Sequence, residues 1–491
     1  METELSKLGL KCGLEIHQQL DTRHKLFCNC RPQLSKHKPV MGVSRNIRAV
    51  AGELGKVDVA ALHETLKGME FHYDVFPEET CLVELDEEPP HEVNKEALEV
   101  ALKVAILLNC EIPDELHVMR KAVIDGSNTT GFQRTVIVGM DGHVETLSGR
   151  VRIANVALEE ESCQIINKGR HTVTYGLDRL GIPLVEIGTH PDIYTPEQAR
   201  EVAEKLGMIL RSTGKVKRGL GTIRQDLNVS IRGGSRVEIK GFQDLRVMHK
   251  IIENEARRQK ELIGKGKKVE EEVRKAEGDG TTSFLRPLPG SARLYPETDV
   301  PPIPLDAQYV ESLGEALPEA WEERISRYQK DYSLNKEIAT SLVKSNMGDM
   351  FEDLAKTGME AGLIATTLTS GLTQIKREGA PVEKLEKRHL KDVFRLLKEG
   401  KIAREALLPL LKMVSENPGE KIDNLIKKLG IESLSIDGLR LLVREIIGSN
   451  KALLGRPNPE KALMGLVMKE VRGRINGETV MKVLREEIEA S

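Results

Sequence analysis

HVETLSGRVRIANVALEEE, residues 143–161, is the stretch that decides the fold. Two runs rich in β-branched and apolar residues flank a Ser-Gly pair, which is typical of two strands joined by a tight turn. GRHTVTYGLDRLGIPLVEIGTH (169–190) and GTIRQDLNVSIRGGSRVEIKGF (221–242) have the same character. We therefore predict a mainly antiparallel sheet in the first part of the chain.

Helical segments interrupt these strands. Residues 93–109 carry apolar side chains at helical spacing. In 195–214, Thr195 is placed to cap a helix, Pro196 to occupy its first position and Gly214 to follow its end. The mixture of strands and helices predicts the α+β class for this part of the chain.

The character of the chain changes at the proline-rich segment 286–305, through which no helix can run. Beyond it, one amphipathic helical pattern follows another. We therefore expect a first domain over 1–305, a helical domain over 306–415 and a tail domain over 416–491. The charged, glycine-punctuated stretch 263–280 is expected to be a linker.

Composition limits the function. The chain has 491 residues, which suggests two to four domains at about 150 residues each. A net charge of −3 argues against a wholly basic nucleic-acid binder but leaves room for a local basic face. No signal-like segment and no apolar stretch of about 20 residues is present, so we expect a cytoplasmic protein.

GLEIHQQL, residues 13–20, is the first candidate for part of a functional site. In a strand, alternation places Glu15, His17 and Gln19 on one side and Leu14, Ile16 and Gln18 on the other. A carboxylate beside an imidazole suits a hard cation or an acid–base pair. A solvent-facing polar edge explains the octapeptide equally well.

Further carboxylates lie on other predicted strands of the same domain. VALEEESCQ (156–164) carries three consecutive acids, of which Glu159 and Glu161 face one way and Glu160 the other. This run is either a cation site or an exposed strand end. Glu186 lies among apolar residues, where a lone carboxylate is costly unless it is paired or metal-bound.

A fourth strand, in RVEIKGF, carries Glu238 and Lys240 on one face. They form either a salt bridge or a metal ligand beside a phosphate-binding amine. Together with the preceding residues they make a plausible Mg²⁺ site, because Mg²⁺ prefers a few carboxylates with phosphates and water. Candidate phosphate and ribose contacts are Arg224, Asp226, Asn228 and Arg293.

Several common motifs are missing from the sequence. It has no P-loop, no Rossmann fingerprint and no G-x-S-x-G elbow, so any use of ATP must follow another design. Cys28 and Cys30 form a C-x-C pair, but a structural zinc needs about four ligands and no second C-x-x-C follows. We therefore favour two packed thiols over a zinc site.

At this point the motifs become recognisable as a set. The chain resembles the B/E family of glutamyl-tRNA(Gln) amidotransferase subunits over nearly its whole length. The phrases IHQQLDT and VIDGSNTTGFQRT are similar to the archaeal E branch. The motifs that carry the resemblance, in collinear order, are GLEIHQQLDT with KLFCNC, LEEE, DRLGIPLVEI, IRQDLNVS, VEIKGF, ARLYPETDVPP and KALMGLVMKEVRGRINGETVMKVL.

The resemblance implies a "cradle" domain for kinase and transamidase chemistry, followed by helical and tail domains that hold tRNA. It implies Mg²⁺, ATP as substrate, Glu-tRNA(Gln), and an asparaginase-like D-type partner that supplies ammonia, in a heterotetramer with two copies of each chain. Catalysis would fall on Glu15, His17, Glu160, Glu186 and Lys240. The family's metal ligands would fall on Glu15, His17, Glu160 and Glu186, with Glu159 and Glu238 close by.

The basic residues of the helical half would contact tRNA. Those expected to do so are Lys376, Arg377, Lys387, Arg388, Lys469, Arg472 and Arg474. An ordinary solvated helix face would show the same charges.

Two departures from the family pattern stand out. Many B-type relatives carry four cysteines near the N-terminus, whereas this chain keeps only Cys28 and Cys30 there. The E branch normally carries an inserted synthetase-like domain, and here only 263–280 occupies its place. Three other hypotheses remain open: a non-catalytic tRNA-binding protein, a metal-dependent hydrolase built on the Glu-x-His pair, and a bacterial B-type chain.

Overall fold

The computed structural model divides into two compact units, Met1–Ala320 and Trp321–Ser491. The residues that it describes are 4–47, 57, 62–63, 65–219, 221–288, 294–345, 347–431, 434–454, 458–471, 474–475 and 477–490.

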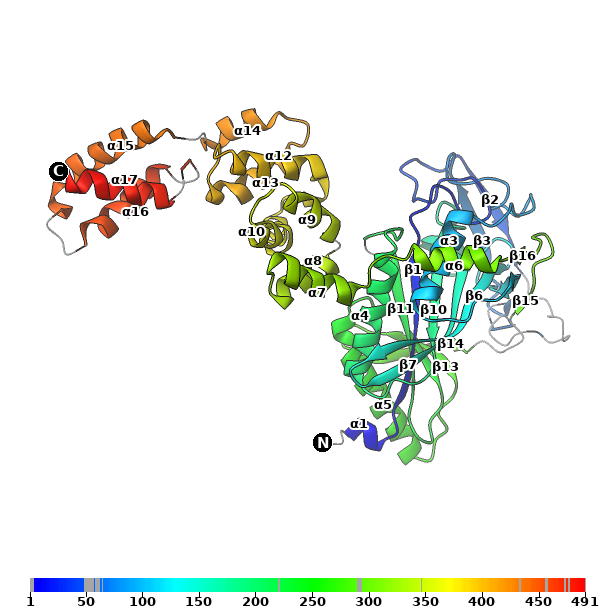
Figure 1. The fold of residues 1–491 in the computed structure, drawn as a ribbon. Helices are drawn as coiled ribbons and strands as arrows, with labels where there is room; N and C mark the ends of the chain where they lie inside the picture. The colour runs from blue at the N-terminus through cyan, green and yellow to red at the C-terminus, as the bar shows by residue number, and fades with distance from the viewer. Residues whose placement is uncertain are drawn as a thin grey trace. The chain divides into compact units, whose positions relative to one another are not determined.

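A ten-stranded sheet forms the centre of the first unit (Figure 1). All neighbouring strands in it are antiparallel except β12 and β13, which confirms the mainly antiparallel prediction. In sheet order the strands are β14 (Thr282–Pro287), β13 (Glu272–Ala276), β12 (Val237–Lys240), β11 (Ile223–Ser230), β1 (Lys11–Gln19), β10 (Pro183–Thr189), β7 (Gly149–Glu160), β6 (Phe132–Thr146), β5 (Val118–Ala122) and β15 (Leu294–Pro296).

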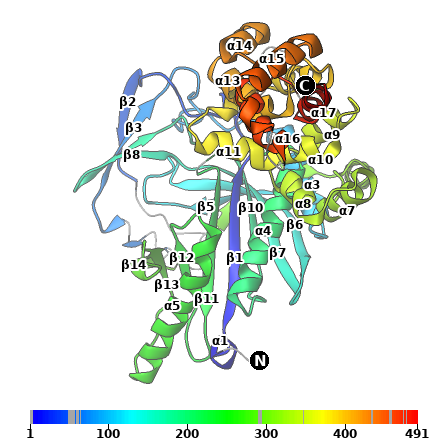
Figure 2. The same ribbon diagram turned by 90° about the vertical axis from the view of Figure 1, so that its left-hand side faces the viewer.

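The first strand of the chain takes a central place in this sheet. Figure 2 shows β1 between β10 and β11, which come about 170 and 210 residues later by the element bounds. The hairpin predicted over 143–161 is present, because β6 and β7 pair from Thr146 and Gly149 outward. Residues 263–280 are not the expected linker. They contain the end of α5 (Leu245–Gly264) and β13, which pairs in parallel with β12.

Two smaller sheets complete the first unit. One contains, in order, β2 (Met41–Arg45), β3 (Glu70–Val75), β9 (Thr172–Gly176) and β8 (Gln164–Lys168). It has a core of its own, in which Tyr73 and Tyr175 stack with ring centroids 5.9 Å apart. The other pairs β16 (Ile303–Pro304) with β4 (Glu115–Leu116).

Helices cover one face of the large sheet. α3 (Lys95–Leu107) packs on β6 and β7, α4 (Pro196–Ser212) on β1 and β6, and α5 on β11. α4 begins as predicted: the Thr195 hydroxyl accepts the N–H of Gln198 at 3.1 Å, and Pro196 is its first residue. Gly214 follows its end at a φ of +68°. The short α1 (Glu4–Lys7) lies near the N-terminus.

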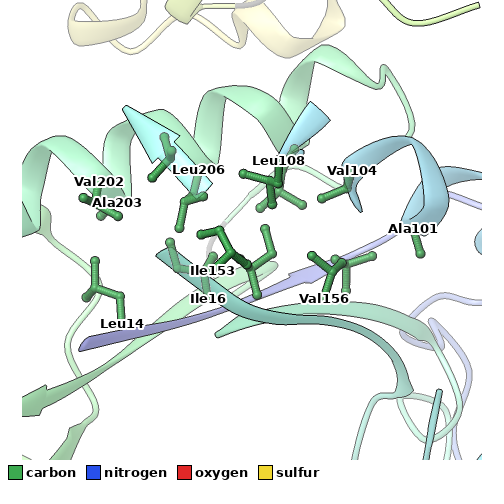
Figure 3. Packing of buried hydrophobic residues seen from close by; sticks show 14 of the residues in the cluster. Leu14, Ile16, Ala101, Val104, Leu108, Ile153, Val156, Val202, Ala203 and Leu206 are labelled. Carbon is green, nitrogen blue, oxygen red and sulfur yellow. The ribbon is translucent and has the colours of Figure 1, made fainter. Parts of the chain in front are cut away.

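The main hydrophobic core lies between these helices and the sheet. Figure 3 shows that α3 contributes Ala101, Val104 and Leu108, the last as its C-cap, and that α4 contributes Val202, Ala203 and Leu206. Strands β1 and β7 meet them with Leu14, Ile16, Ile153 and Val156. Because strand residues alternate between faces, the neighbours of Leu14 and Ile16 on β1 must point to the opposite, helix-free face.

The second unit is helical (Figure 1), so the α+β class with a helical second part is confirmed. Its first core includes Phe351, Phe394 and Leu410. The helices around it are α7 (Trp321–Tyr332), α8 (Lys336–Lys344), α9 (Gly348–Ala355), α10 (Ala361–Thr366), the π-helix η2 (Thr367–Gly371), α11 (Leu372–Arg377), η3 (Val382–Lys384), α12 (Lys387–Lys398), η4 (Arg404–Ala406), α13 (Leu407–Glu416) and α14 (Ile422–Leu429).

A second helical core follows, built around Val443, Val467 and Leu484. Its elements are α15 (Ile436–Ser449), η5 (Lys451–Leu453), α16 (Pro459–Val471) and α17 (Gly477–Glu489). α6 (Ala307–Glu315), which we assigned to the helical domain, contacts α3 of the first unit, and α14 joins the first helical core through Leu425. The exact three-part division stays a prediction. Among the described residues, no helix combines the length and apolarity that crossing a membrane requires.

Candidate active site

A cleft of about 640 Å³ opens on the helix-free face of the large sheet. We call it the acidic cleft. Eight neighbouring strands, from β12 across to β15, contribute side chains to it. The charged and amide residues of these strands that line it are Glu15, His17, Lys121, Gln133, Glu159, Glu186, Arg224, Gln225, Asp226, Asn228, Glu238 and Lys240.

The pairing register explains why residues so distant in sequence meet here. His17 lies opposite Glu186 on β10, and Glu15 lies opposite Asp226 on β11. Cross-strand partners in a sheet present their side chains to the same face. The alternation that buries Leu14 therefore brings Glu15 and its partners into the cleft, as the sequence predicted for this strand.

One group of donors gathers around Lys121. The Glu186 carboxylate lies 3.1 Å from the Nε2 atom of His17, and Lys121 Nζ donates to Glu159 at 2.5 Å and to Glu186 at 3.2 Å. Thr135 also donates to Glu159, at 2.9 Å. One donor atom each from His17, Glu159 and Glu186 lies within 4.8 Å of the other two. This spacing is compact enough for a shared cation.

The charges of this group act on one another. Burial would lower the pKa of His17, but its hydrogen bond to Glu186 and the nearby carboxylates raise that pKa above its ordinary value. Burial would raise the pKa of Glu186, but Lys121 and His17 hold it well below its ordinary value. Burial, and then the charge of Glu186, raise the pKa of Glu159. The two carboxylates therefore differ in basicity.

A second group lies beside the first, around Lys240. Its donors come from Glu15, Asp226 and Glu238, and they also lie within 4.8 Å of one another. Lys240 donates to Asp226 at 2.5 Å and forms an ion pair with Glu238. Asn228 donates to Glu15 at 3.3 Å. Burial, and then the charges of Glu186 and Glu238, raise the pKa of Glu15.

The structure does not bring Glu160 into the acidic cleft. Its carboxylate accepts the backbone N–H of Arg134 at 2.9 Å and lines a small separate cavity with Lys25 and Glu84. The reason is strand alternation: Glu159 points into the cleft, so its neighbour on β7 points away. Glu159, rather than Glu160, therefore lies with the other predicted metal ligands in the acidic cleft.

The candidate phosphate contacts fall into two sets. Arg224 lines the cleft and donates to Glu161 at 2.9 Å, and Asp226 and Asn228 belong to the Lys240 group. Arg293 lies outside the described residues.

Sequence reasoning missed Lys121, which lies between the two carboxylates of the first group. The residue precedes VIDGSNTTGFQRT, a phrase that was noted for its resemblance but not for its chemistry. Alternation along β5 gave a usable signal only once the order of the strands was known. Arg236 and Arg286, which also line the cleft, were missed for the same reason.

Comparisons with known proteins now decide the family. A model of the GatB/GatE catalytic domain matches residues 10–311, and a GatB domain model matches residues 349–488. The chain belongs to the GatB/GatE family.

Curated GatB/GatE relatives align over their full length. The E-type chain of glutamyl-tRNA(Gln) amidotransferase from Methanocaldococcus jannaschii is 38% identical over 628 positions, covering 99% of this chain and 100% of the relative. Its counterpart in Archaeoglobus fulgidus is 38% identical over 620 positions, covering 99% of both chains. That of Methanococcus vannielii is 37% identical over 626 positions, also covering 99% of both.

These alignments are more than a hundred positions longer than the 491-residue chain. The relatives therefore carry residues that this GatB/GatE chain lacks. The place at which the relatives carry these additional residues, which we expect to correspond to 263–280, stays a prediction.

The surroundings of the C-x-C pair in this GatB/GatE chain also differ from the predicted two packed thiols. Cys28 and Cys30 do not stand alone, because Cys81 and Glu84 place donor atoms within 4.8 Å of theirs. Cys28 donates to Glu84 at 2.9 Å, and Lys25 lies 3.1 Å from the same carboxylate. Four such donors match the ligand number of structural zinc. The fourth donor is a glutamate, in the spacing C-x-C…C-x-x-E, so a search for four cysteines does not find it.

The basic residues expected to contact tRNA lie on the helical unit. Lys376 and Arg377 end α11 and are exposed, as is Lys469 on α16. Lys387 and Arg388 begin α12 and are paired with Asp353 and Glu386 respectively. Arg474 is half-buried beyond α16, and Arg472 lies outside the described residues.

Proposed function

We propose that this ligase chain activates the γ-carboxylate of Glu-tRNA(Gln) with ATP and Mg²⁺ and amidates it to Gln-tRNA(Gln). Ammonia would come from an asparaginase-like partner of the D type, in a cytoplasmic heterotetramer. The observation that supports this proposal is that two clusters of carboxylates lie beside each other on one face of the sheet. Each cluster contains a lysine. The relatives named above are subunits of the corresponding enzyme.

The donor set fits Mg²⁺. The two groups contain five carboxylates, whereas Lys121 and Lys240 supply the only two permanent positive charges within them. This excess of negative charge, with oxygen donors from several strands, suits a hard divalent cation. Those that would hold it are Glu15, His17, Glu159, Glu186, Asp226 and Glu238. When bound, Mg²⁺ supplies charge neutralisation for the phosphates of ATP.

The residues of the chain have distinct roles in this proposal. A carboxylate is a poor electrophile, and transfer of a phosphoryl group makes one of its oxygens a leaving group. Lys240 and Arg224 would hold the transferred group, because both present donors to the cleft. Ammonia would then attack the activated carbonyl carbon, and the phosphate would leave.

The helical unit would hold the body of the tRNA. Lys376 and Arg377 are the strongest candidates, because they are exposed at the end of α11. Lys387 and Arg388 would first have to exchange an ion pair for a phosphate. Such contacts predict salt-sensitive binding.

Two neighbouring glutamates provide the sharpest test. Glu159→Gln and Glu160→Gln make the same chemical change at adjacent residues on opposite faces of β7. We expect Glu159→Gln and His17→Ala to lower tRNA-stimulated ATP cleavage by more than about 100-fold, the upper end for losing a partner of a metal ligand. Glu160→Gln should retain activity within a few-fold. The assay measures ADP and Gln-tRNA(Gln) formed with the partner protein, Mg²⁺ and Glu-tRNA(Gln).

Each alternative has its own outcome in this assay. If Glu160→Gln abolishes ATP cleavage and Glu159→Gln does not, the assignment to the cleft is wrong. If the unmodified chain binds tRNA but never cleaves ATP, the chain is a tRNA-binding protein without this catalytic role. Hydrolysis without ATP or tRNA would instead indicate a metal-dependent hydrolase.

A further inference from the structure

A second cleft, of about 900 Å³, lies at the end of β1. We call it the basic cleft. One wall is formed by residues between Asp21 and Leu34, after β1, and the other by Val216, Lys217, Arg218, Gly221 and Thr222. Its cationic side chains are those of Arg23, Arg31, Arg179, Lys217 and Arg218, and Asp21 is the single acid among its described lining residues.

Among the residues that the structure describes, Arg31 is the only one of these five cations that forms an ion pair, with Glu78 at 2.5 Å. Neither Arg23 nor Arg218 makes a side-chain hydrogen bond or ion pair with any residue that the structure describes. Lys217 and Arg179 donate to backbone carbonyls, which carry no net charge. Burial lowers the pKa of Arg218, and it lowers that of Lys217 to about 8. An anion in the cleft would relieve this unfavourable burial of positive charge.

The basic cleft adjoins the acidic cleft. Glu161 lines the acidic cleft, where it accepts from Arg224, and its other oxygen accepts from Gln19 of the basic cleft at 3.0 Å. Along the chain, His17 of one cleft and Asp21 of the other are four residues apart, or about 13 Å at the rise of an extended strand. A ligand can therefore span both clefts.

We infer that the basic cleft binds the phosphodiester groups of the single-stranded 3′ end of aminoacylated tRNA and leads the aminoacyl group into the acidic cleft. This inference rests on the proposed function. The carboxylates of the acidic cleft repel RNA phosphates, so the terminal nucleotides need compensating cations just outside it. The unmatched guanidinium groups of Arg23 and Arg218 stand at that place.

The expected size of the effect follows from counterion release. Each phosphate contact to a single strand contributes about 0.7 to the slope of log K against log salt. This corresponds to an affinity about fivefold higher at 0.1 M salt than at 1 M salt. Replacing both Arg23 and Arg218 should therefore weaken binding about 25-fold and reduce the slope by about 1.4.

The experiment compares two RNA probes on the full-length chain. One is tRNA(Gln) with an intact 3′ end, and the other is the same tRNA without its last three nucleotides. The variant Arg23→Gln/Arg218→Gln should lose about 25-fold in affinity for the intact RNA and less than about twofold for the shortened RNA. The control, Arg150→Gln/Arg152→Gln, removes the same charge from exposed positions on β7 and should leave both affinities unchanged.

Four results would overturn the inference, and one would support it. Equal losses on both RNAs would place the contact elsewhere on the tRNA, and no loss on either would leave the cleft without an RNA role. A fall in ATP affinity with unchanged RNA affinity would assign the cleft to the nucleotide. Binding as expected without any ATP cleavage would support the inference while removing the proposed activity. Failure of the unmodified chain to bind tRNA would remove both.

Discussion

Glu297 offers the most direct test of how the first unit is held together. Its side chain is completely buried beyond the end of β15. It accepts from Arg134 Nε at 2.7 Å, from the guanidinium of Arg120, and from the backbone N–H groups of Thr298 and Asp299 at 2.8 and 3.0 Å. The network joins three strands, because Arg120 lies on β5 and Arg134 on β6.

The substitution Glu297→Gln keeps the shape of this side chain and removes its charge. One oxygen becomes an NH₂ group that faces a guanidinium, and Arg134, of which only 5% of the side chain is exposed, keeps Glu160 at 3.6 Å as its remaining carboxylate. Breaking one side of a buried ion pair costs about 3–5 kcal/mol. We therefore expect the free energy of local unfolding around β15 to fall by about 3 kcal/mol.

The pH dependence gives an independent measure of the same energy. Burial alone would raise the pKa of Glu297, but Arg120 and Arg134 lower it to about 2. A lowered pKa means that the stabilisation is fully present above the unfolded pKa of about 4.3 and is lost as the pH falls towards 2. A shift of about two units corresponds to about 3 kcal/mol, in agreement with the estimate from the broken pair.

Amide hydrogen exchange, read by mass spectrometry on peptides from β5, β6 and β15, is the appropriate assay. At pH 7 a loss of about 3 kcal/mol should accelerate exchange about 100-fold in these peptides. Acid unfolding should show the difference between the variant and the unmodified chain shrinking between pH 4 and pH 2.

Asp299→Asn is the matched control. Asp299 also pairs with Arg120, at 3.2 Å, but its side chain is 50% exposed, so its loss should cost less than about 1 kcal/mol. Exchange of Glu297→Gln at the same rate as the unmodified chain, or an effect independent of pH, would show that the buried ion pairs do not stabilise these strands.

Three further predictions concern local structure. Gly126 has a φ of +83°, and an added Cβ would overlap the Phe71 ring, so Gly126→Ala should destabilise the first unit by more than about 2 kcal/mol in urea unfolding. An unchanged midpoint would contradict this. Thr195→Ala removes the cap of α4 and should cost about 1 kcal/mol; Thr195→Ser, which retains the acceptor, should cost less. We expect metal analysis to find zinc bound by the chain and Cys81→Ser to lose most of it; a zinc content unaffected by Cys81→Ser would exclude the cluster as its site.

Local patterns predicted much of the fold. Alternation in GLEIHQQL separated Leu14 from Glu15, and the turn residues near Gly149 marked the β6–β7 hairpin. These features depend on neighbours in sequence. The cap at Thr195 was predictable for the same reason, because its acceptor and donor lie three residues apart.

The remaining features depend on contacts between distant segments. Three consecutive acids cannot show which one faces the cleft until β7 is paired with β10, where Glu159 lies opposite Leu184. The contribution of Lys121 to the site becomes evident only when the strand order places β5 beside β6 in the large sheet. The stretch 263–280 was misjudged as a linker because its charged residues masked a short strand that pairs with β12.

The central position of β1 has a consequence for synthesis on the ribosome. Its two partners, β10 and β11, leave the ribosome only after Pro183–Thr189 and Ile223–Ser230 have been translated. At about 5–20 residues per second, β1 therefore waits roughly 9–34 s for β10 and roughly 11–42 s for β11. Nascent chains shorter than about 230 residues cannot pair both edges of β1. They should depend on chaperones that shield exposed strand edges.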